Sequence, residues 1–242
     1  MNGIRMRQIC LVARHLAPVV DEIGSGLGLS VCHRDPAVGK YGLENALFPV
    51  GDKFLEVVAP VREGTTAGRY LDRRRGDGGY MVITQCDDLA PRRARCEALG
   101  VRIANEIGSP DYRELQLHPR DVGGAMLSFA WQDGARSPGG PWHPAASDGS
   151  AQAAPGPIRA MTAAELQSED PDRLARRWSD VIERPVRVQD GQRVIRLDDA
   201  TLRFTEATDG RGEGLAGLDL ASADPARHGL VLICGIRFRL VA

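Results

Sequence analysis

The sequence predicts an α+β protein built from tandem β-α-β-β-β units, the last of which is truncated. The chain has 242 residues, of which 43% are hydrophobic and 26% charged, enough apolar side chains for a packed core. Strand-like apolar segments lead repeatedly into a proline that suits the first turn of a helix, where its missing N–H costs nothing. These prolines are Pro18, Pro91, Pro171 and Pro225. Four such repeats predict four copies of one small unit.

The first unit opens with an apolar strand at 9–12. Apolar residues then recur with helical spacing up to Leu27, although two glycines in that segment each weaken the helix by about 1 kcal/mol. Two strands follow at 43–49 and 53–59, separated by a turn that contains a glycine.

The second and third units repeat this order. In the second, a strand at 81–84 precedes a short helix at 91–99, which Gly100 ends. Its later strands are predicted at 101–107, 112–117 and 125–131. In the third, Asp170 suits the N-cap of a helix with an apolar stripe. Its later strands are predicted at 186–188, 192–197 and 201–205.

The fourth unit is short. Only seventeen residues follow Pro225, enough for strands at 230–234 and 236–241 but hardly for a helix. An open sheet edge left by this truncation would need covering, by the chain itself or by the partner in a homodimer. The expected organisation is a complete two-unit domain at 1–132, a linker rich in Gly, Pro, Ala and Ser at 133–157, and the third unit with the truncated fourth at 158–242.

Charge and composition exclude several classes of protein. The 31 basic and 32 acidic residues give a net charge of -1, which argues against nucleic acid or an anionic membrane as the main partner. No segment approaches the roughly 20 apolar residues of a membrane helix, and the N-terminal residues do not resemble a secretion signal. The five cysteines contain no Cys-x-x-Cys, so we expect reduced and mostly buried thiols. A cytoplasmic protein is expected.

Four segments occur in a characteristic order. Residues 8–16 (QICLVARHL) form an opening strand, and 42–52 (GLENALFPVGD) contain the strand before the last. Residues 54–60 (FLEVVAP) form a last strand that carries a carboxylate, and 118–124 (HPRDVGG) lead to the last strand of the second unit. Together they resemble the vicinal oxygen chelate superfamily of glyoxalases, methylmalonyl-CoA epimerases, extradiol dioxygenases and bleomycin-resistance proteins, in particular a bacterial glyoxalase-like domain protein.

The resemblance implies that units pair into curved mixed β-sheets around a central cleft, where the first and last strands of each unit hold a divalent metal. The positions that match the ligands are Gln8, Glu56, Met81 and Ser128. A carboxylate and an amide oxygen suit a hard or borderline cation, but a thioether and a neutral hydroxyl do not. We therefore expect a degenerate site with no metal and no other cofactor, which disfavours a metal-dependent glyoxalase, epimerase or dioxygenase.

Glu56 is the first candidate for catalysis. On a strand it shares a face with Phe54 and Val58, which makes it a carboxylate within an apolar stripe. Such a group must find a partner or raise its pKa, and carboxylates with a raised pKa cluster at functional sites. The alternative is a solvent-facing residue or a structural ion pair with one of the many arginines.

Other polar residues have two interpretations each. Gln8 either binds a substrate carbonyl or ends a strand. One of Glu44 and Asn45 faces the cleft, and the sequence leaves open which. We name Asn45 as a candidate for substrate binding. His118 is either a general acid or base, since its pKa lies near neutrality, or a turn residue. Arg120 suits a carboxylate or phosphate group, or else a solvated surface.

Two classes of function fit these residues. The first is a lyase or isomerase of small carbonyl or acyl compounds, in which Glu56 moves a proton next to a carbonyl while Gln8 and His118 orient the oxygen. The second is a metal-free protein that sequesters a mostly apolar small molecule, as bleomycin-resistance proteins do. The binding candidates are Gln8, Asn45, Phe54, Met81 and Ser128, with Phe48 and Met126 as additional apolar lining. Residues 142–144 (Trp-His-Pro) form either a lid or part of the linker's packing.

Overall fold

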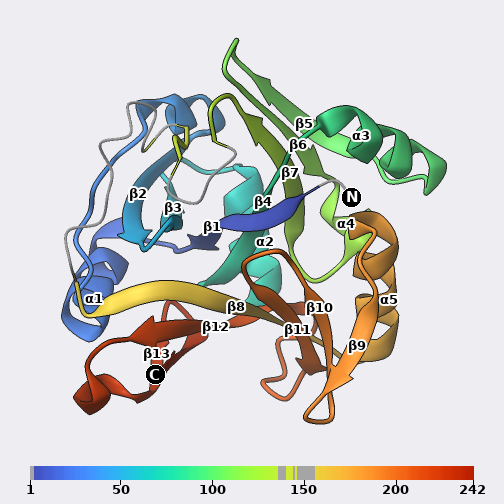
Figure 1. Cartoon of the computed structure of the whole chain (residues 1–242). Coiled ribbons are helices and arrows are strands. Elements are labelled where there is room, and N and C mark those ends of the chain that lie inside the picture. Colours follow the sequence, from blue (N-terminus) through green and yellow to red (C-terminus); the bar gives the residue numbers. More distant parts are fainter. Residues whose placement is uncertain (1–2, 136–139, 144, 146–155) are drawn as a thin grey trace.

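The structure is a computed structural model that describes residues 3–135, 140–143, 145 and 156–242 (Figure 1). Seven strands form a first sheet in the order β2-β3-β1-β4-β7-β6-β5, and seven form a second in the order β13-β14-β12-β8-β11-β10-β9. The first sheet contains β1 (Ile4–Val12), β2 (Leu43–Val50), β3 (Lys53–Pro60), β4 (Gly78–Cys86), β5 (Ile103–Gly108), β6 (Tyr112–Leu117) and β7 (Met126–Gln132). The second contains β8 (Ile158–Ser168), β9 (Val186–Gln189), β10 (Gln192–Arg196), β11 (Thr201–Glu206), β12 (Gly214–Ser222), β13 (Gly229–Ile233) and β14 (Ile236–Val241).

Both sheets follow one plan. Two units meet at an antiparallel pair of strands, β1 with β4 in the first sheet and β12 with β8 in the second. Within each unit the opening strand pairs in parallel with the last strand, as in β1 with β3 and β8 with β11. One unit of each sheet contributes four strands and the other three. The predicted α+β fold of tandem units with a truncated last member is confirmed.

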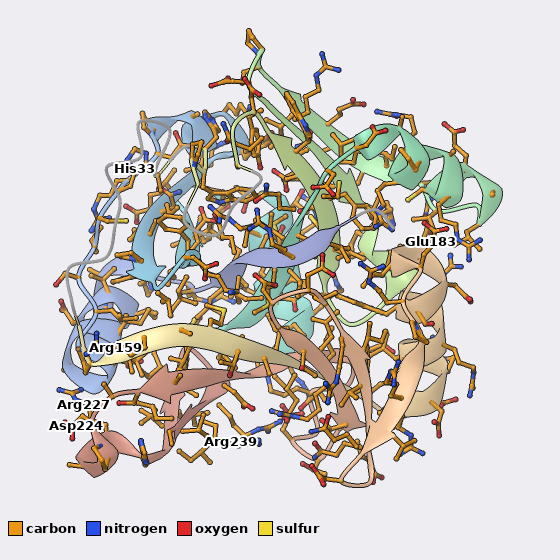
Figure 2. All side chains as sticks on the ribbon, in the orientation of Figure 1. His33, Arg159, Glu183, Asp224, Arg227 and Arg239 are labelled. Atoms are coloured by element: carbon orange, nitrogen blue, oxygen red, sulfur yellow. The ribbon has the colours of Figure 1, made fainter. Side chains whose placement is uncertain are left out.

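The first unit has the three strands predicted from its residues, one fewer than the general β-α-β-β-β order implies. After α1 (Leu16–Leu27), a single bridge between His33 and Leu47 and the 3-10 turn η1 (Pro36–Tyr41) precede β2. Figure 2 labels His33 on this segment. Pro36 has no N–H to give to a neighbouring strand, and Asp35 caps the turn, so the segment turns instead of extending.

Capping side chains decide where the main helices begin. Asp170 accepts a hydrogen bond from the N–H of Arg173 at 2.9 Å, which starts α5 (Pro171–Ile182) as predicted. Asp88 caps α3 (Leu89–Ala98) in the same way, so this helix begins two residues before the predicted position.

Two further helices are absent from the prediction. Thr65 caps α2 (Thr66–Arg74), which buries only two apolar side chains, too few for a clear periodic pattern. The other, α4 (Pro119–Val122), is a single turn. In the fourth unit the 3-10 turn η2 (Pro225–Arg227) takes the place of a helix, as the length of that unit predicts.

One hydrophobic core fills the space between the two sheets, with α1 and α5 at opposite ends of it (Figure 1). Alternate residues face it, for example Ile9 and Leu11 of β1 and Leu218 and Leu220 of β12. Gly79 of β4 lies where the sheets approach each other, since a Cβ there would be 2.5 Å from the side chain of Leu215. The other residues of each sheet therefore point away from the core.

Three other features bear on the expectations. All five cysteines are free; four are buried and Cys32 is exposed. No helix in the described part of the chain is long and apolar enough to cross a membrane. β13 is an edge strand on which Leu230 and Leu232 are exposed, and its pairing with a partner subunit stays a prediction.

Candidate functional site

A cavity of about 490 Å³ opens on the face of the first sheet that points away from the core. All seven strands of this sheet contribute to its lining, together with η1 and the first turn of α2. Its polar lining includes Gln8, Asp35, Lys40, Glu56, Asn105, Glu114, Gln116 and His143. Most of the remaining lining is apolar or aromatic, which is typical of a small-molecule site.

Glu56 is the centre of a buried hydrogen-bond network in this cavity. Its side chain points to the cavity because β3 alternates between core and cavity residues, and it is only 7% exposed. Oε2 accepts a hydrogen bond from Nε2 of Gln8 at 2.8 Å, and Oε1 accepts one from Nδ2 of Asn45 at 2.7 Å. The structure thus brings three of the candidates together. Glu44, the neighbour of Asn45, is exposed, so Asn45 is the residue on the cavity side of β2, where it is buried against Glu56 and does not itself line the cavity.

Both amides are held with their N–H groups toward Glu56. Oε1 of Gln8 accepts a hydrogen bond from the indole N–H of Trp142 at 2.8 Å. Oδ1 of Asn45 accepts one from the backbone N–H of Asp35 at 2.8 Å. A flip of either amide would break these bonds. The site therefore suits a group at position 56 that accepts a hydrogen bond at each of its two polar atoms. A carboxylate meets that requirement and a carboxamide does not.

The protonation of Glu56 is set by two opposing effects. Burial raises the pKa of Glu56 above its usual 4.5, because the charged form loses its hydration. The hydrogen bonds from Asn45 and Gln8 lower this pKa, but they do not offset the effect of burial. The result is a buried carboxyl group that exchanges protons nearer neutral pH than an exposed one.

Glu114 is a second buried carboxyl group in the same cavity, and it was not among the residues expected from the sequence. Oε2 accepts a hydrogen bond from the Tyr112 hydroxyl at 2.9 Å. Burial raises the pKa of Glu114, and the negative charge of Glu114 in turn raises the pKa of Glu56. The alternation of Tyr112, Glu114 and Gln116 with Leu115 and Leu117 is the pattern that would have placed it on the cavity face.

A break in the register of β1 and β4 brings Tyr80 into the cavity. Cys10 pairs with Met81, but Leu11 pairs with Gly79, so Tyr80 is the extra residue of a β-bulge. Both Tyr80 and Met81 consequently line the cavity, although they are neighbours in sequence. Burial raises the pKa of Tyr80, which keeps its hydroxyl protonated as a hydrogen-bond donor.

Part of the linker packs over this network. The predicted linker, 133–157, lies partly outside the described residues, and so does Pro144. Trp142 is fully buried, with its ring against Tyr112 and with the Arg7 guanidinium 5.1 Å from the ring centroid. His143 lines the cavity and donates its backbone N–H to Gln132 at 2.9 Å. Of the two interpretations, the described residues show packing against the sheet.

Replacement of Trp142 by Phe tests this contact. We expect the free energy of unfolding to fall by about 1–3 kcal/mol, because the buried Oε1 of Gln8 loses its donor. Urea denaturation measures the change. The control is Trp131→Phe, at a half-buried position where we expect a change of about 0.5 kcal/mol or less. Equal effects of the two substitutions would show that the indole N–H adds nothing.

The other predicted lining residues divide into three groups. Met81 and Met126 line the cavity as predicted. Phe54 and Ser128 are buried beneath it and do not line it, although Ser128 lies close enough to Glu114 to lower its pKa against the larger effect of burial. The prediction for Phe48 is wrong, because it alternates with Asn45 and Leu47 and so faces the core between the sheets.

His118 does not reach this cavity. Its Nδ1 accepts a hydrogen bond from the backbone N–H of Arg120 at 3.3 Å and caps α4. Arg102 lies 3.2 Å from the same nitrogen. The structure therefore favours the turn interpretation, in which His118 caps α4 outside the cavity.

The donor set of the metal positions does not fit a hard or borderline cation. Gln8 and Glu56 are hydrogen-bonded to each other. Met81 offers only a thioether, and Ser128 lies beneath the cavity surface. Among residues 3–135, 140–143, 145 and 156–242, no three His, Cys, Asp or Glu side chains gather where they could hold a metal ion.

The corresponding face of the second sheet holds ion pairs. Nε of Arg203 lies 2.9 Å from Glu165, and its Nη1 and Nη2 each lie 2.8 Å from the two oxygens of Asp219. Arg237 lies 2.7 Å from Glu165, and Arg239, which Figure 2 labels, lies near both carboxylates. Burial raises the pKa of Glu165, but the hydrogen bonds from Arg237 and Arg203 outweigh it and hold this pKa below 4.5. Among the described residues, these acids of the second sheet are thus bound in ion pairs, whereas Glu56 and Glu114 of the first sheet lie at an apolar cavity.

Comparisons with known proteins agree with this architecture. A model of the glyoxalase-like domain matches residues 9–182. A hypothetical protein from Staphylococcus aureus is 12% identical in sequence, over 98% of each chain, with a TM-score of 0.72. At that identity the likeness concerns the fold alone.

Smaller solved structures match about half of the chain. A variant of the Streptomyces coelicolor methylmalonyl-CoA epimerase, in complex with 2-nitronate-propionyl-CoA, is 21% identical over 53% of this chain and 97% of its own, with a TM-score of 0.47. A methylmalonyl-CoA epimerase in complex with methylmalonyl-CoA and an ammonium ion is 23% identical over 56% and 99%, with a TM-score of 0.49. No curated protein matches the chain.

Proposed function

This chain belongs to the glyoxalase-like domain family, and from its cavity we propose that it binds a small carbonyl or acyl compound and that Glu56 transfers a proton on it without a metal ion. The observation that supports the proposal is the buried Glu56, which two oriented amides hold at an apolar cavity. A general base needs a pKa near the operating pH and access to the substrate proton. Burial raises the pKa of Glu56 toward that range, and the cavity gives a substrate access to its carboxyl group.

The proposed reaction begins with the carbon next to the carbonyl close to Glu56. The carboxylate removes a proton from that carbon, and negative charge develops on the carbonyl oxygen. Tyr80 is the donor that we assign to this oxygen, because its protonated hydroxyl lines the same cavity and has no hydrogen-bond partner among the described residues. Glu56 then delivers the proton to a different carbon of the delocalised anion, so the product is an isomer. In a lyase reaction the anion instead expels a group from the neighbouring carbon as a double bond forms, and that group leaves with the proton held by Glu56.

A second candidate function is the capture of a cationic ligand without turnover. The observation in its favour is Glu114, which gives the cavity two buried carboxyl groups in addition to Asp35, against Lys40 as the only lysine or arginine among the described lining residues. Tyr80 and Tyr112 add aromatic surface, which suits an organic cation. In this function Glu56 binds the cation and moves no proton.

Hydrogen exchange separates the two functions. The protein is incubated in D2O with a panel of small ketones, aldehydes and acyl esters, and NMR follows deuterium at the carbon next to the carbonyl. We expect one class to exchange faster with the protein than without it. If no compound of the panel exchanges and an apolar ammonium compound binds saturably, proton transfer is refuted and capture of a cationic ligand is supported.

The exchange rate should depend on pH through Glu56. Because the base acts in its ionised form, the rate should rise with pH, with a midpoint above 4.5. The same raised pKa means that the contribution of Glu56 to stability is lost as the pH rises through it. Glu114→Gln removes a neighbouring negative charge and should move the midpoint to lower pH. A midpoint that stays fixed in this variant contradicts the coupling of the two carboxyl groups.

A further inference from the structure

A second cavity, of about 470 Å³, opens beside the first. The two cavities share Thr66, Tyr80 and Met126 in their linings. Helix α2 lies on one side of the second cavity, and α4 with the glycines that follow it and α5 lie on the other. A molecule that enters the first cavity can therefore extend into the second.

The second cavity differs from the first in charge. Its ionisable lining consists of Arg73, Arg120, Arg173 and Arg177 with Asp121 and Glu213. Four guanidinium groups against two carboxylates leave two positive charges in excess. The first cavity, by contrast, has an excess of carboxyl groups.

The two carboxylates of the second cavity are already bound. Asp121 receives two hydrogen bonds from the guanidinium of Arg102, at 2.9 and 2.8 Å, and this arginine does not line the cavity. Glu213 accepts from Arg173 at 2.6 Å and from the Ser168 hydroxyl at 2.9 Å. The acids consequently leave most of the cavity's positive charge uncompensated.

Three of the arginines keep donors without a carboxylate partner among the described residues. Arg177 donates its Nε to the backbone oxygen of Asp121 at 2.7 Å. Arg73 lies 5.9 Å from the ring centroid of Tyr70, which limits where its guanidinium can point. Arg120 is exposed on α4, held near the cavity by the cap at His118. Planar guanidinium groups with free donors bind phosphate and carboxylate groups in pairs of hydrogen bonds.

We propose that the second cavity binds an anionic group, a phosphate or a carboxylate, at the far end of the molecule whose carbonyl part occupies the first cavity. This inference rests on the proposed function and narrows the substrate class to compounds with an acidic tail. Arg73 and Arg120 bind the tail and fix which carbon lies at Glu56. Neither residue takes part in the proton transfer.

Binding of two probes at low ionic strength tests the proposal. Isothermal titration calorimetry measures pyrophosphate in one arm and succinate in the other. The wild-type protein should bind at least one of them saturably, and the Arg73→Gln/Arg120→Gln double variant should bind it about tenfold or more weakly. Arg113→Gln, at an exposed arginine outside this cavity, should bind as the wild type does. Pyrophosphate binding indicates a phosphate tail, and succinate binding alone indicates a carboxylate tail.

Either of two outcomes overturns the proposal. The first is no saturable binding of either probe, and the second is an equal loss in Arg113→Gln, which would indicate unspecific attraction by surface arginines. Circular dichroism checks that each variant is folded. Failure here is distinct from failure of the proposed function, because Glu56→Gln should bind the anionic probe as the wild type does while its hydrogen exchange is lost.

Discussion

Glu56→Gln should lower the rate of hydrogen exchange about 10³-fold, the usual loss when a general base is removed. The amide of glutamine is not basic, so the proton on the substrate carbon has no acceptor at this position. The substitution also places an N–H against Gln8 or Asn45, whose own N–H groups are fixed toward residue 56. NMR of the deuterated substrate at saturating concentration measures the rate.

Two controls make this result specific. Glu44→Gln changes an exposed glutamate on the adjacent strand and should exchange at the wild-type rate. Glu56→Asp keeps the acid but withdraws it by one methylene, so part of the activity should remain. A rate in Glu56→Gln within threefold or so of the wild type, with the protein folded, would refute the role of Glu56 as the base.

Glu165→Ala should lower the free energy of unfolding by about 3 kcal/mol. This carboxylate lies between Arg203 and Arg237 on the second sheet, and its removal leaves a mostly buried guanidinium with fewer partners. The value stands at the lower end of the range for buried pairs, because Arg203 keeps both hydrogen bonds to Asp219 and Arg237 is partly exposed.

The pH dependence of stability gives an independent check on Glu165. Since its folded-state pKa is lowered, its contribution is present above about pH 4.5 and is lost as the pH falls through the folded-state pKa. Glu206→Ala, at the exposed end of β11, should change the free energy by about 0.5 kcal/mol or less. If urea denaturation at neutral pH gave the same result for both variants, the ion-pair network would not stabilise the second sheet.

The fold was largely predictable because its signals are local. Apolar runs, prolines and capping residues such as Asp170 lie close in sequence to the elements that they specify. The missing strand of the first unit shows the limit, since Pro36 and the single bridge at His33 replace a pairing that the repeat implied. Helix α2 was not predicted because it buries too few apolar residues to give a helical period.

The candidate site was predictable only in part. Strand alternation and the family resemblance placed Gln8 and Glu56 on one face, and alternation restricted the choice to Glu44 or Asn45. Contacts across long sequence separations decided the rest. Trp142 orients Gln8 from the linker, and Tyr80 enters the cavity through a bulge that no short pattern shows. His118 was left with two interpretations because a histidine before a proline gives the same pattern for a cap as for a site residue.

The central claim is that this cavity moves protons with Glu56 and needs no metal ion. The most direct measurement is the exchange rate of one substrate in wild-type protein stripped with a chelator, before and after addition of manganese, iron(II), nickel or zinc. We expect the stripped protein to keep its full exchange rate, and we expect none of these metals to raise it. Exchange that disappears on stripping and returns with one of these ions would show instead that the reaction depends on a metal ion.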